Sequence, residues 1–283
     1  MKILLTGSEG QLGLCFQDCA PASWNILPTD SSELDITNKE KVLSVVCDFR
    51  PDVIVNAAAY TAVDKAESEG ELAALVNVIG PGNLAMAARG VGAKFFHIST
   101  DYVFDGTSKA PYLETDETNP LSIYGKTKLD GEHAVFGILP DAVVIRTAWV
   151  FSEYGSNFVK TMLRLVNNLD ELRIINDQRG CPTYAGDIAQ AIVEMININP
   201  VGGIYNFCGD REVSWCEFAK IIFERAYKEG KINSIPSIKA IETAQYPTAA
   251  VRPKYSSLNG DKIKELGIKL SNWELSLSKI LHG

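Results

Sequence analysis

The sequence predicts an α/β fold, with a Rossmann-like doubly wound parallel sheet and a smaller C-terminal substrate domain. Strand and helix patterns alternate through the first half of the chain, and a glycine-rich turn joins the first strand to the first helix. The strands are short apolar runs, which is typical of parallel strands that helices cover on both faces. We expect a dinucleotide-binding domain at residues 1–150. Residues 151–283 should form mainly a substrate-binding domain, with some strands and helices returning to the first.

The elements of the first half follow from apolar periodicity. Strands are predicted at residues 2–6, 25–30, 52–59, 94–99 and 142–146. Helices are predicted up to about residue 20 and then at 38–49, 67–89 and 123–136, where Gly80-Pro81-Gly82 should kink or restart the third of them. Beyond residue 150 the order is less regular. We expect helices near 156–169, 186–197, 214–228 and 273–281, and strands near 172–175 and 203–207.

Composition excludes several classes of protein. The 283 residues are 46% hydrophobic and carry a formal net charge of −8, which favours a soluble protein and disfavours nucleic acid or an anionic membrane as partner. The apolar run at the N-terminus is too short for a signal peptide, and no stretch approaches the length of a membrane span. The six cysteines show no Cys-x-x-Cys pair and no metal-ligand spacing with the three histidines. We therefore expect a cytoplasmic protein with reduced thiols and no metal site.

The first motif is the segment Gly7-Ser8-Glu9-Gly10-Gln11-Leu12-Gly13, between a strand and a helix. Glycines in such a turn let the backbone approach a pyrophosphate, whose charge is met by N–H groups at the helix N-terminus. The spacing of Gly7, Gly10 and Gly13 is typical of extended short-chain dehydrogenases. A glycine-rich turn without a ligand is the alternative, but the flanking strand and helix favour a dinucleotide site.

Three further segments are candidates for cofactor contacts. Asp30 ends the second predicted strand, where a carboxylate can bind the adenosine ribose and disfavour a 2′-phosphate, which favours NADH. Asp35-Ile36 lies where many such enzymes contact the adenine. Either acidic residue can equally belong to a local turn or helix cap. The segment Asn56-Ala57-Ala58-Ala59-Tyr60-Thr61 follows a buried strand, and its small side chains leave room for a cofactor.

The chemistry is predicted at two places. Thr100 ends the strand at residues 94–99, and Tyr124 and Lys128 are four residues apart on one face of a helix. A phenol has an unperturbed pKa near 10, and we expect the Lys128 ammonium to lower the pKa of Tyr124 so that it can act as a general acid. Thr100 can polarise a substrate carbonyl by hydrogen bonding. Together with the glycine turn, these residues predict a reductase that uses a nicotinamide cofactor.

The sequence resembles the dTDP-4-dehydrorhamnose reductase family of extended short-chain dehydrogenases over essentially its whole length. The resemblance rests on Thr61-Ala62-Val63-Asp64-Lys65-Ala66-Glu67, on Ser99-Thr100-Asp101-Tyr102-Val103-Phe104, and on Tyr124-Gly125-Lys126-Thr127-Lys128. It continues through Arg146-Thr147-Ala148-Trp149-Val150, Asn176-Asp177-Gln178, Pro182-Thr183, Tyr246-Pro247-Thr248 and Arg252-Pro253.

The resemblance implies a function and a set of site residues. The reaction would be hydride delivery from NADPH or NADH to C4 of dTDP-4-dehydro-L-rhamnose, in dTDP-L-rhamnose synthesis. The implied catalytic residues are Thr100, Tyr124 and Lys128, and the implied substrate contacts are Thr100, Asp101 and Trp149. The implied cofactor contacts, added to the glycine turn, are Gly10, Gln11, Leu12, Asp30, Asp35, Ile36, Ala59, Tyr60, Thr61 and Tyr124, and we also expect a contact from Lys128.

Assembly and alternatives follow from the same resemblance. Some members are dimers that Mg²⁺ bridges through glutamates, but the corresponding positions here hold Cys15 and Gly186, which are poor ligands for a hard cation. We expect a monomer or weak homodimer. One alternative function is reduction of another nucleotide-linked keto-deoxysugar. The other is a non-catalytic dinucleotide-binding regulatory subunit, against which the intact catalytic residues argue.

Overall fold

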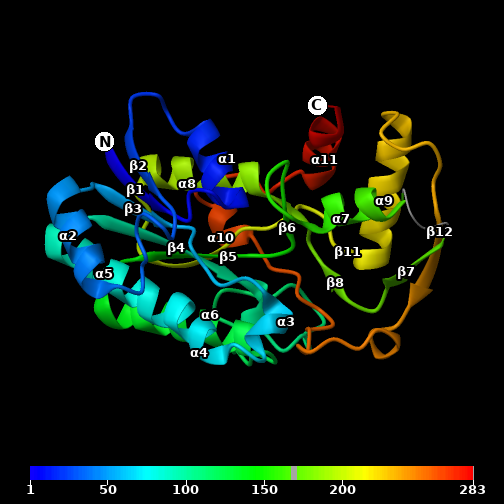
Figure 1. Ribbon diagram of the computed structural model, residues 1–283, viewed down its shortest axis with the longest axis horizontal. Helices are drawn as coiled ribbons and strands as arrows, with labels where there is room; N and C mark the ends of the chain where they lie inside the picture. Colours follow the sequence, from blue (N-terminus) through cyan, green and yellow to red (C-terminus); the bar gives the residue numbers. More distant parts are fainter. Residues whose placement is uncertain (167–170, 283) are drawn as a thin grey trace.

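A computed structural model describes residues 1–166 and 171–282 of the chain. Six parallel strands form the central sheet in the order β10-β5-β4-β3-β1-β2 (Figure 1). Their bounds are β1 Lys2–Thr6, β2 Asn25–Thr29, β3 Val53–Asn56, β4 Lys94–Thr100, β5 Val143–Thr147 and β10 Gly203–Asn206. In register, Leu4 of β1 pairs with Leu27 of β2 on one side and Ile54 of β3 on the other. The predicted fold class is confirmed.

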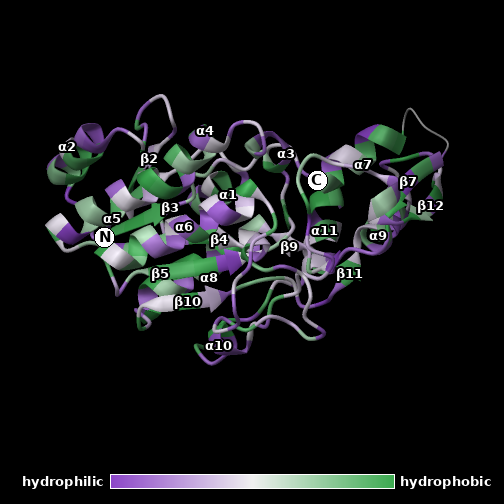
Figure 2. Cartoon of the chain, turned by 90° about the horizontal axis from the view of Figure 1, so that it is seen from below, coloured by the Kyte–Doolittle hydropathy of each residue, from purple (hydrophilic) through white to green (hydrophobic). Residues whose placement is uncertain are grey.

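Helices cover both faces of the sheet. One face carries α1 Gln11–Cys19 and α8 Ala185–Ile198; the other carries α2 Lys39–Phe49, α5 Gly80–Val91 and α6 Ile123–Ile138. Successive strand residues point to opposite faces. Ile3 and Leu5 therefore join the core under α1 and α8, while Leu4 joins the core under α2 and α5. In Figure 2 the hydrophobic colouring follows the central strands.

The second half of the chain forms a smaller unit beside the sheet. It contains α7 Phe158–Val166, α9 Trp215–Lys228, α11 Trp273–His282, and the parallel pair β7 Glu171–Ile175 and β12 Ser237–Ile241. The core of this unit surrounds Phe218 and Trp273, which are fully buried. Two elements of the second half, β10 and α8, belong to the main sheet and its covering layer. Division into two domains stays a prediction.

Several short elements were not predicted. They are α3 Val63–Ala66, the 3₁₀ turns η2 Asp101–Val103 and η3 Thr243–Gln245, α10 Asp261–Lys264, and the two-residue strands β6 Val150–Phe151, β8 Arg179–Gly180, β9 Thr183–Tyr184 and β11 Val213–Ser214. Such short segments carry no readable periodicity. β12 was missed too, because its segment Ser237–Ile241 is mostly exposed and has no apolar run. Part of the helix predicted near 156–169 falls on residues 167–170, outside the described residues.

The third helix of the first half departs from an α-helix in the turn directly before its glycines and proline. It runs as α4 Gly70–Ala74, a π-helical turn η1 Leu75–Ile79, and then α5 without a break. The widened turn lies directly before Gly80-Pro81-Gly82, and π turns of this kind are frequent at functional sites. By length and composition, Gly70–Val91 could span a membrane, contrary to the sequence expectation, but 56% of its most apolar window is buried inside the protein.

Candidate active site

The predicted site residues gather at the carboxyl ends of β1, β3 and β4. The chain passes from β1 to β2 on one side and places β3 on the other side of β1. Ligands of open α/β sheets bind at such a reversal, beyond the carboxyl ends of the strands. The glycine turn follows β1, the Asn56–Thr61 segment follows β3, and Thr100 ends β4.

Two glycines of the turn, Gly7 and Gly13, lie too close to neighbouring backbone atoms to be replaced by a residue with a side chain. Gly7 has a φ of +71°, and a methyl group built on it would lie 2.6 Å from the amide nitrogen of Ala58. A methyl group on Gly13 would lie 2.2 Å from the carbonyl oxygen of Gly7. Gly10 precedes α1, whose first amides have no acceptor within the helix and whose first turn carries no acidic side chain. This cradle fits the pyrophosphate of a dinucleotide.

A buried hydrogen-bond chain joins the ends of β1, β3 and β4. Asn56 Oδ1 accepts from Thr6 Oγ1 at 2.7 Å and from the amide of Ala58 at 3.1 Å, so its Nδ2 faces Nδ1 of His97 at 3.0 Å. Because Asn56 Nδ2 can only donate, His97 is neutral and carries its proton on Nε2. Burial holds the pKa of His97 well below its ordinary value, and the nearby Lys128 charge lowers it further. His97 is thus a core residue that helps fix the strand ends.

The π turn positions the loop after β3. Asn77, fully buried in this turn, accepts from the amide of Tyr60 at 2.9 Å and donates to its carbonyl at 3.1 Å. The same Nδ2 group donates to Thr127 Oγ1 at 3.1 Å. Asn77 therefore connects the predicted cofactor loop to the helix that carries Tyr124 and Lys128. Sequence reasoning missed Asn77; the signal that could have found it is an asparagine within an otherwise apolar helical pattern.

The two acidic candidates for cofactor binding are engaged in local turns. Asp30 Oδ1 accepts from the amide of Ser32 at 2.8 Å, and Asp35 Oδ1 accepts from the amide of Thr37 at 2.9 Å. Asp30 lies at the same edge as the glycine turn, since the amide of Ser8 donates to the carbonyl of Thr29, the residue before Asp30, at 3.1 Å. The Ile36 side chain is buried in the core, where it occupies the space beside Gly80.

The other cofactor candidates differ in their contacts and in their exposure. Gln11 Oε1 accepts from Ser152 Oγ at 3.0 Å and from Asn157 Nδ2 at 2.9 Å, so the start of α1 is fixed to the second half of the chain. Leu12 packs partly into the core. Ala59 is half-buried and Thr61 is exposed.

The structure brings Thr100, Tyr124 and Lys128 together. Thr100 is buried at the end of β4, accepts from the amide of Tyr102 at 3.2 Å and hydrogen-bonds the Tyr124 phenol. Tyr124 lies on the first turn of α6, with its ring edge-on to that of Tyr102 at 5.6 Å. Lys128, 2% exposed, lies one turn further along, and its ammonium donates to the carbonyl of Ile98 at 2.6 Å.

The start of α6 is fixed by three contacts. Ser122 Oγ accepts from the amide of Gly125 at 3.1 Å, and Glu67 accepts from the amide of Ile123 at 2.9 Å. These bonds satisfy amides that have no acceptor within the helix. A methyl group on Gly125 would lie 2.2 Å from the carbonyl oxygen of Tyr102, so only glycine permits this approach to the loop after Thr100.

The expected effect of Lys128 on Tyr124 is wrong for this structure. Burial raises the pKa of Tyr124 to about 12, opposed by its hydrogen bond with Thr100. Burial lowers the pKa of Lys128 to about 8, opposed by the Glu132 charge. Spacing along a helix fixes the face but not the direction of a long side chain, and the Lys128 ammonium points to the carbonyl of Ile98. A phenol with a raised pKa remains protonated, as a proton donor must be.

Asp101 is a buried carboxyl group beside Thr100. It is 2% exposed, and Thr100 Oγ1 donates to its Oδ1 at 3.1 Å. Burial raises the pKa of Asp101 to about 6, while hydrogen bonds from Ser256 and Thr100 lower it.

A buried ion pair lies beneath the catalytic helix. Arg146 on β5 donates to both carboxylate oxygens of Glu132, at 3.0 Å from Nε and 2.7 Å from Nη2, and both side chains are at most 3% exposed. Ser99 Oγ donates to the same carboxylate. Glu132 is four residues beyond Lys128 on α6, so this pair ties α6 to the ends of β4 and β5. Sequence reasoning missed Glu132.

Trp149 occupies a constrained position at the end of β5. Its φ is +47°, and its half-buried indole stacks on Trp215, the first residue of α9, with ring centroids 3.5 Å apart. Its neighbour Thr147 pairs with Thr100 across the sheet. Trp149 therefore lies between the catalytic residues and the second half of the chain.

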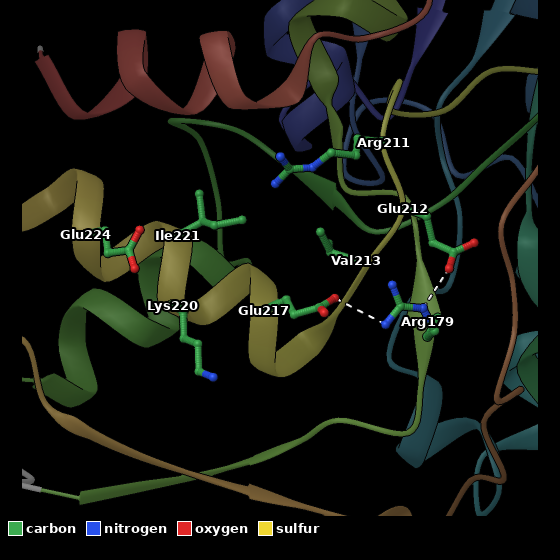
Figure 3. A pocket seen from close by; sticks show the side chains of 8 residues that line it. All are labelled: Arg179, Arg211, Glu212, Val213, Glu217, Lys220, Ile221 and Glu224. Carbon is green, nitrogen blue, oxygen red and sulfur yellow. Dashed lines mark hydrogen bonds and ion pairs between the residues drawn. The ribbon is translucent and has the colours of Figure 1, made fainter.

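A hollow in the second half is lined by charged side chains (Figure 3). Arg179 on β8 lies between two carboxylates, 2.6 Å from Glu212 and 3.2 Å from Glu217. Its charge is therefore already compensated, and the hollow contains none of the predicted catalytic residues. The ion pairs fix the strand that leads to Gly180.

Within residues 1–166 and 171–282, no cluster of three or more His, Cys, Asp or Glu side chains could hold a metal ion. Cys15 is buried, and burial raises the pKa of its thiol to about 12. Gly186 lies against the ring of Tyr184, where a methyl group would come within 2.3 Å.

Comparisons with known proteins agree with this geometry. The sequence matches the family described as RmlD substrate binding domain over residues 1–283. A dTDP-4-dehydrorhamnose reductase of Aggregatibacter actinomycetemcomitans is 45% identical over 287 residues, which cover 99% of this chain and 98% of that protein.

Two solved structures are similar over the same extent. The crystal structure of a dTDP-4-dehydrorhamnose reductase from Clostridium acetobutylicum matches with a TM-score of 0.93 at 42% identity, covering 99% of this chain and 98% of that one. The dTDP-4-dehydrorhamnose reductase of Bacillus anthracis, solved in complex with NADP, matches with a TM-score of 0.93 at 38% identity and the same coverage. The similarity therefore includes both halves of the chain.

Proposed function

This chain belongs to the RmlD substrate binding domain family of dTDP-4-dehydrorhamnose reductases, and on that premise we propose that it reduces the C4 keto group of dTDP-4-dehydro-L-rhamnose with NADPH or NADH. The product is dTDP-L-rhamnose. The observation that carries the proposal is the meeting of Thr100, Tyr124 and Lys128 at the edge of the sheet where the glycine turn lies.

Each of these residues has a distinct role in the proposal. The nicotinamide cofactor, when bound, supplies the hydride. Tyr124 gives its phenolic proton to the oxygen on C4 as the carbon–oxygen double bond becomes a single bond, and its buried environment keeps it protonated until then. Thr100 hydrogen-bonds the same oxygen and orients the phenol. Lys128, whose ammonium also donates to the carbonyl of Ile98, holds the cofactor ribose.

The dinucleotide is held, in this proposal, by the turn Gly7–Gly13 at its pyrophosphate and by the loop Ala59–Thr61. Asp30 faces the adenosine ribose, and Asp101 and Trp149 contact the sugar. NADPH oxidation, followed with dTDP-4-dehydro-L-rhamnose and with UDP- and GDP-linked keto sugars, tests the function. We expect the highest kcat/KM with the dTDP-sugar. Binding of NADPH without turnover of any of these sugars would favour a regulatory subunit instead.

Replacement of Asp30 with alanine should change the cofactor preference. The partly exposed carboxylate repels a 2′-phosphate, so its loss should improve NADPH affinity relative to NADH by about two- to fivefold. The two dissociation constants, measured by quenching of protein fluorescence, give the ratio. Asp35→Ala is the matched control and should leave the ratio closer to that of the wild type. An unchanged ratio in Asp30→Ala would place Asp30 away from the ribose.

The alkaline limb of the pH profile of kcat/KM should reflect the titration of Lys128 rather than that of Tyr124. Burial favours the neutral amine and lowers the pKa of Lys128 to about 8, so the ammonium is present below pH 8 and is lost as the pH rises through that value. Tyr124 keeps its proton to a much higher pH. We expect kcat/KM, which reports the free enzyme, to fall above about pH 8. An alkaline limb at pH 10 or higher would contradict this assignment.

Assembly should not depend on a divalent cation. Cys15 and Gly186 offer no hard oxygen ligand, so EDTA should change neither turnover nor the mass measured by light scattering. A chelator that halves the mass would show a metal-bridged dimer.

A further inference from the structure

Two indole rings meet face to face between the two halves of the chain. Trp149 follows β5 of the main sheet, and Trp215 begins α9 in the second half. Their planes are 4° from parallel and their ring centroids are 3.5 Å apart. A centroid distance this short leaves almost no lateral offset, whereas aromatic pairs generally prefer offset or edge-on arrangements. The surrounding structure must therefore hold the two rings in this arrangement.

The backbone and one edge of Trp149 are both constrained. Its φ of +47° is uncommon for a bulky side chain and persists only where the surroundings impose it. A methyl group built on Gly180 would lie 2.7 Å from Cε2 and 2.8 Å from Nε1 of Trp149, so only glycine permits the ring to lie there. The strand carrying Gly180 is fixed by the ion pairs of Arg179 with Glu212 and Glu217 (Figure 3).

Trp215 is supported from behind. The ring of Phe158 lies 4.6 Å from that of Trp215 at an angle of 49°, and Phe218 lies further into the same core at 6.4 Å. Trp215 therefore cannot withdraw without disturbing the aromatic core of the second half. It presents a fixed surface to Trp149.

The stacked rings are connected to the catalytic residues. Thr147, two residues before Trp149, pairs with Thr100 in the sheet. A methyl group built on Gly180 would also lie 3.0 Å from Ser256 Oγ, so Ser256 borders the space beside the edge of Trp149. Ser256 in turn hydrogen-bonds Asp101. A displacement of the Trp149 ring would thus occur next to the groups proposed to hold the sugar.

We propose that Trp215 is a positioning residue for the substrate: it supports one face of Trp149 and so sets the height and tilt of the face that contacts the sugar. The inference rests on the proposed function, in which Trp149 contacts the substrate. Because Trp215 covers one face of Trp149, the sugar can contact Trp149 only through the part of the ring that stays exposed. Trp215 itself touches neither the substrate nor the cofactor.

Replacement of Trp215 with alanine should affect substrate binding selectively. We expect KM for dTDP-4-dehydro-L-rhamnose to rise about three- to tenfold, the worth of an aromatic pair, with a smaller change in kcat. The dissociation constant of NADPH should not change. Trp215→Phe keeps an aromatic surface and should restore most of the loss. If Trp215→Ala does not fold, two milder variants test the same inference: Trp215→Phe, and Gly180→Ala, whose methyl group would push the edge of the Trp149 ring. Each should raise KM by a smaller factor.

A double-mutant cycle separates positioning from general stabilisation. If Trp215 acts through Trp149, the double variant Trp149→Ala/Trp215→Ala should have the KM of Trp149→Ala within about twofold. Additive effects on KM would show that Trp215 acts independently of Trp149 and would overturn the inference.

Circular dichroism gives a readout that does not depend on turnover. Two indoles stacked at this distance couple strongly, and a rotation between their in-plane transition dipoles gives an exciton couplet in the far ultraviolet, which Trp149→Phe and Trp215→Phe should each abolish. Trp24→Phe is the control and should retain it, since Trp24 lies in the first half, 6.4 Å from Phe16. A couplet that one of these two substitutions abolishes and the other leaves unchanged would show that Trp149 and Trp215 are not coupled to each other, and would overturn the inference.

The outcomes distinguish this inference from the proposed function. A wild-type protein that does not reduce the dTDP-sugar overturns both. In an active wild type, a KM unchanged by Trp149→Ala overturns the sugar contact of Trp149 and with it the role of Trp215. A KM that responds to Trp149→Ala but not to Trp215→Ala overturns the role of Trp215 alone.

Discussion

Replacement of Tyr124 with phenylalanine is expected to lower kcat by about 10²–10⁴-fold, the usual contribution of a positioned general acid. This corresponds to roughly 3–5 kcal/mol of activation free energy. The substitution removes one oxygen atom and keeps the ring, whose edge-on contact with Tyr102 at 5.6 Å should persist. The affinity for NADPH should change far less, because the dinucleotide is held mainly at Gly7–Gly13. Single-turnover kinetics with saturating NADPH would measure the chemical step directly.

Tyr112→Phe is the matched control. Tyr112 is also a buried tyrosine, but its hydroxyl bonds Asp105 and the amide of Ser108, away from Thr100. Its loss should cost stability and leave kcat near the wild-type value. If Tyr124→Phe retained most of its kcat, Tyr124 would not be the proton donor, and the regulatory-subunit alternative would have to be reconsidered.

Replacement of Glu132 with alanine is expected to lower the free energy of unfolding by about 3–5 kcal/mol, because it leaves the buried Arg146 charge without its carboxylate. Both side chains are at most 3% exposed, so water cannot compensate the guanidinium. The hydroxyl of Ser99 would lose its acceptor as well. Chemical denaturation followed by circular dichroism at neutral pH would measure the change.

Two further variants test this explanation. Glu132→Leu/Arg146→Met removes both charges and fills the space, so it should recover most of the lost stability. Lys264→Ala breaks the ion pair with Asp261, whose side chains are 52% and 69% exposed, and should cost less than about 1 kcal/mol. A Glu132→Ala protein no less stable than Lys264→Ala would show that the buried pair contributes little.

The strands of the main sheet could be predicted because they are continuous apolar runs. The glycine turn could be predicted because the spacing of its glycines follows from a close approach of two backbone segments. The candidate catalytic residues could be predicted because each lies at a strand end or on one helix face. What the sequence could not provide is the direction of long side chains. Lys128 and Tyr124 share a face of α6, but the ammonium turns to the carbonyl of Ile98.

Contacts between segments that are far apart along the chain could not be predicted from the sequence either. Asn77 is 50 residues from Thr127, and Trp149 is far from Trp215 along the chain. No periodicity links such pairs, because they meet only after the sheet and the second half have formed. The short strands around Gly180 could not be predicted from the sequence either, because they are defined by hydrogen bonding to a partner strand and not by apolar spacing.

The position of β10 has a consequence for the order in which the protein can fold during synthesis. When residues 1–150 have left the ribosome, β5 is an open edge of the sheet, and α8 has not yet been made to cover the face beside α1. An unpaired edge and an uncovered apolar face both favour association with other chains. Residues 185–206 complete the sheet and its covering layer together. A fragment ending near residue 150 should therefore aggregate when it is expressed alone, and a chain cut there should not yield a separately folded nucleotide-binding unit.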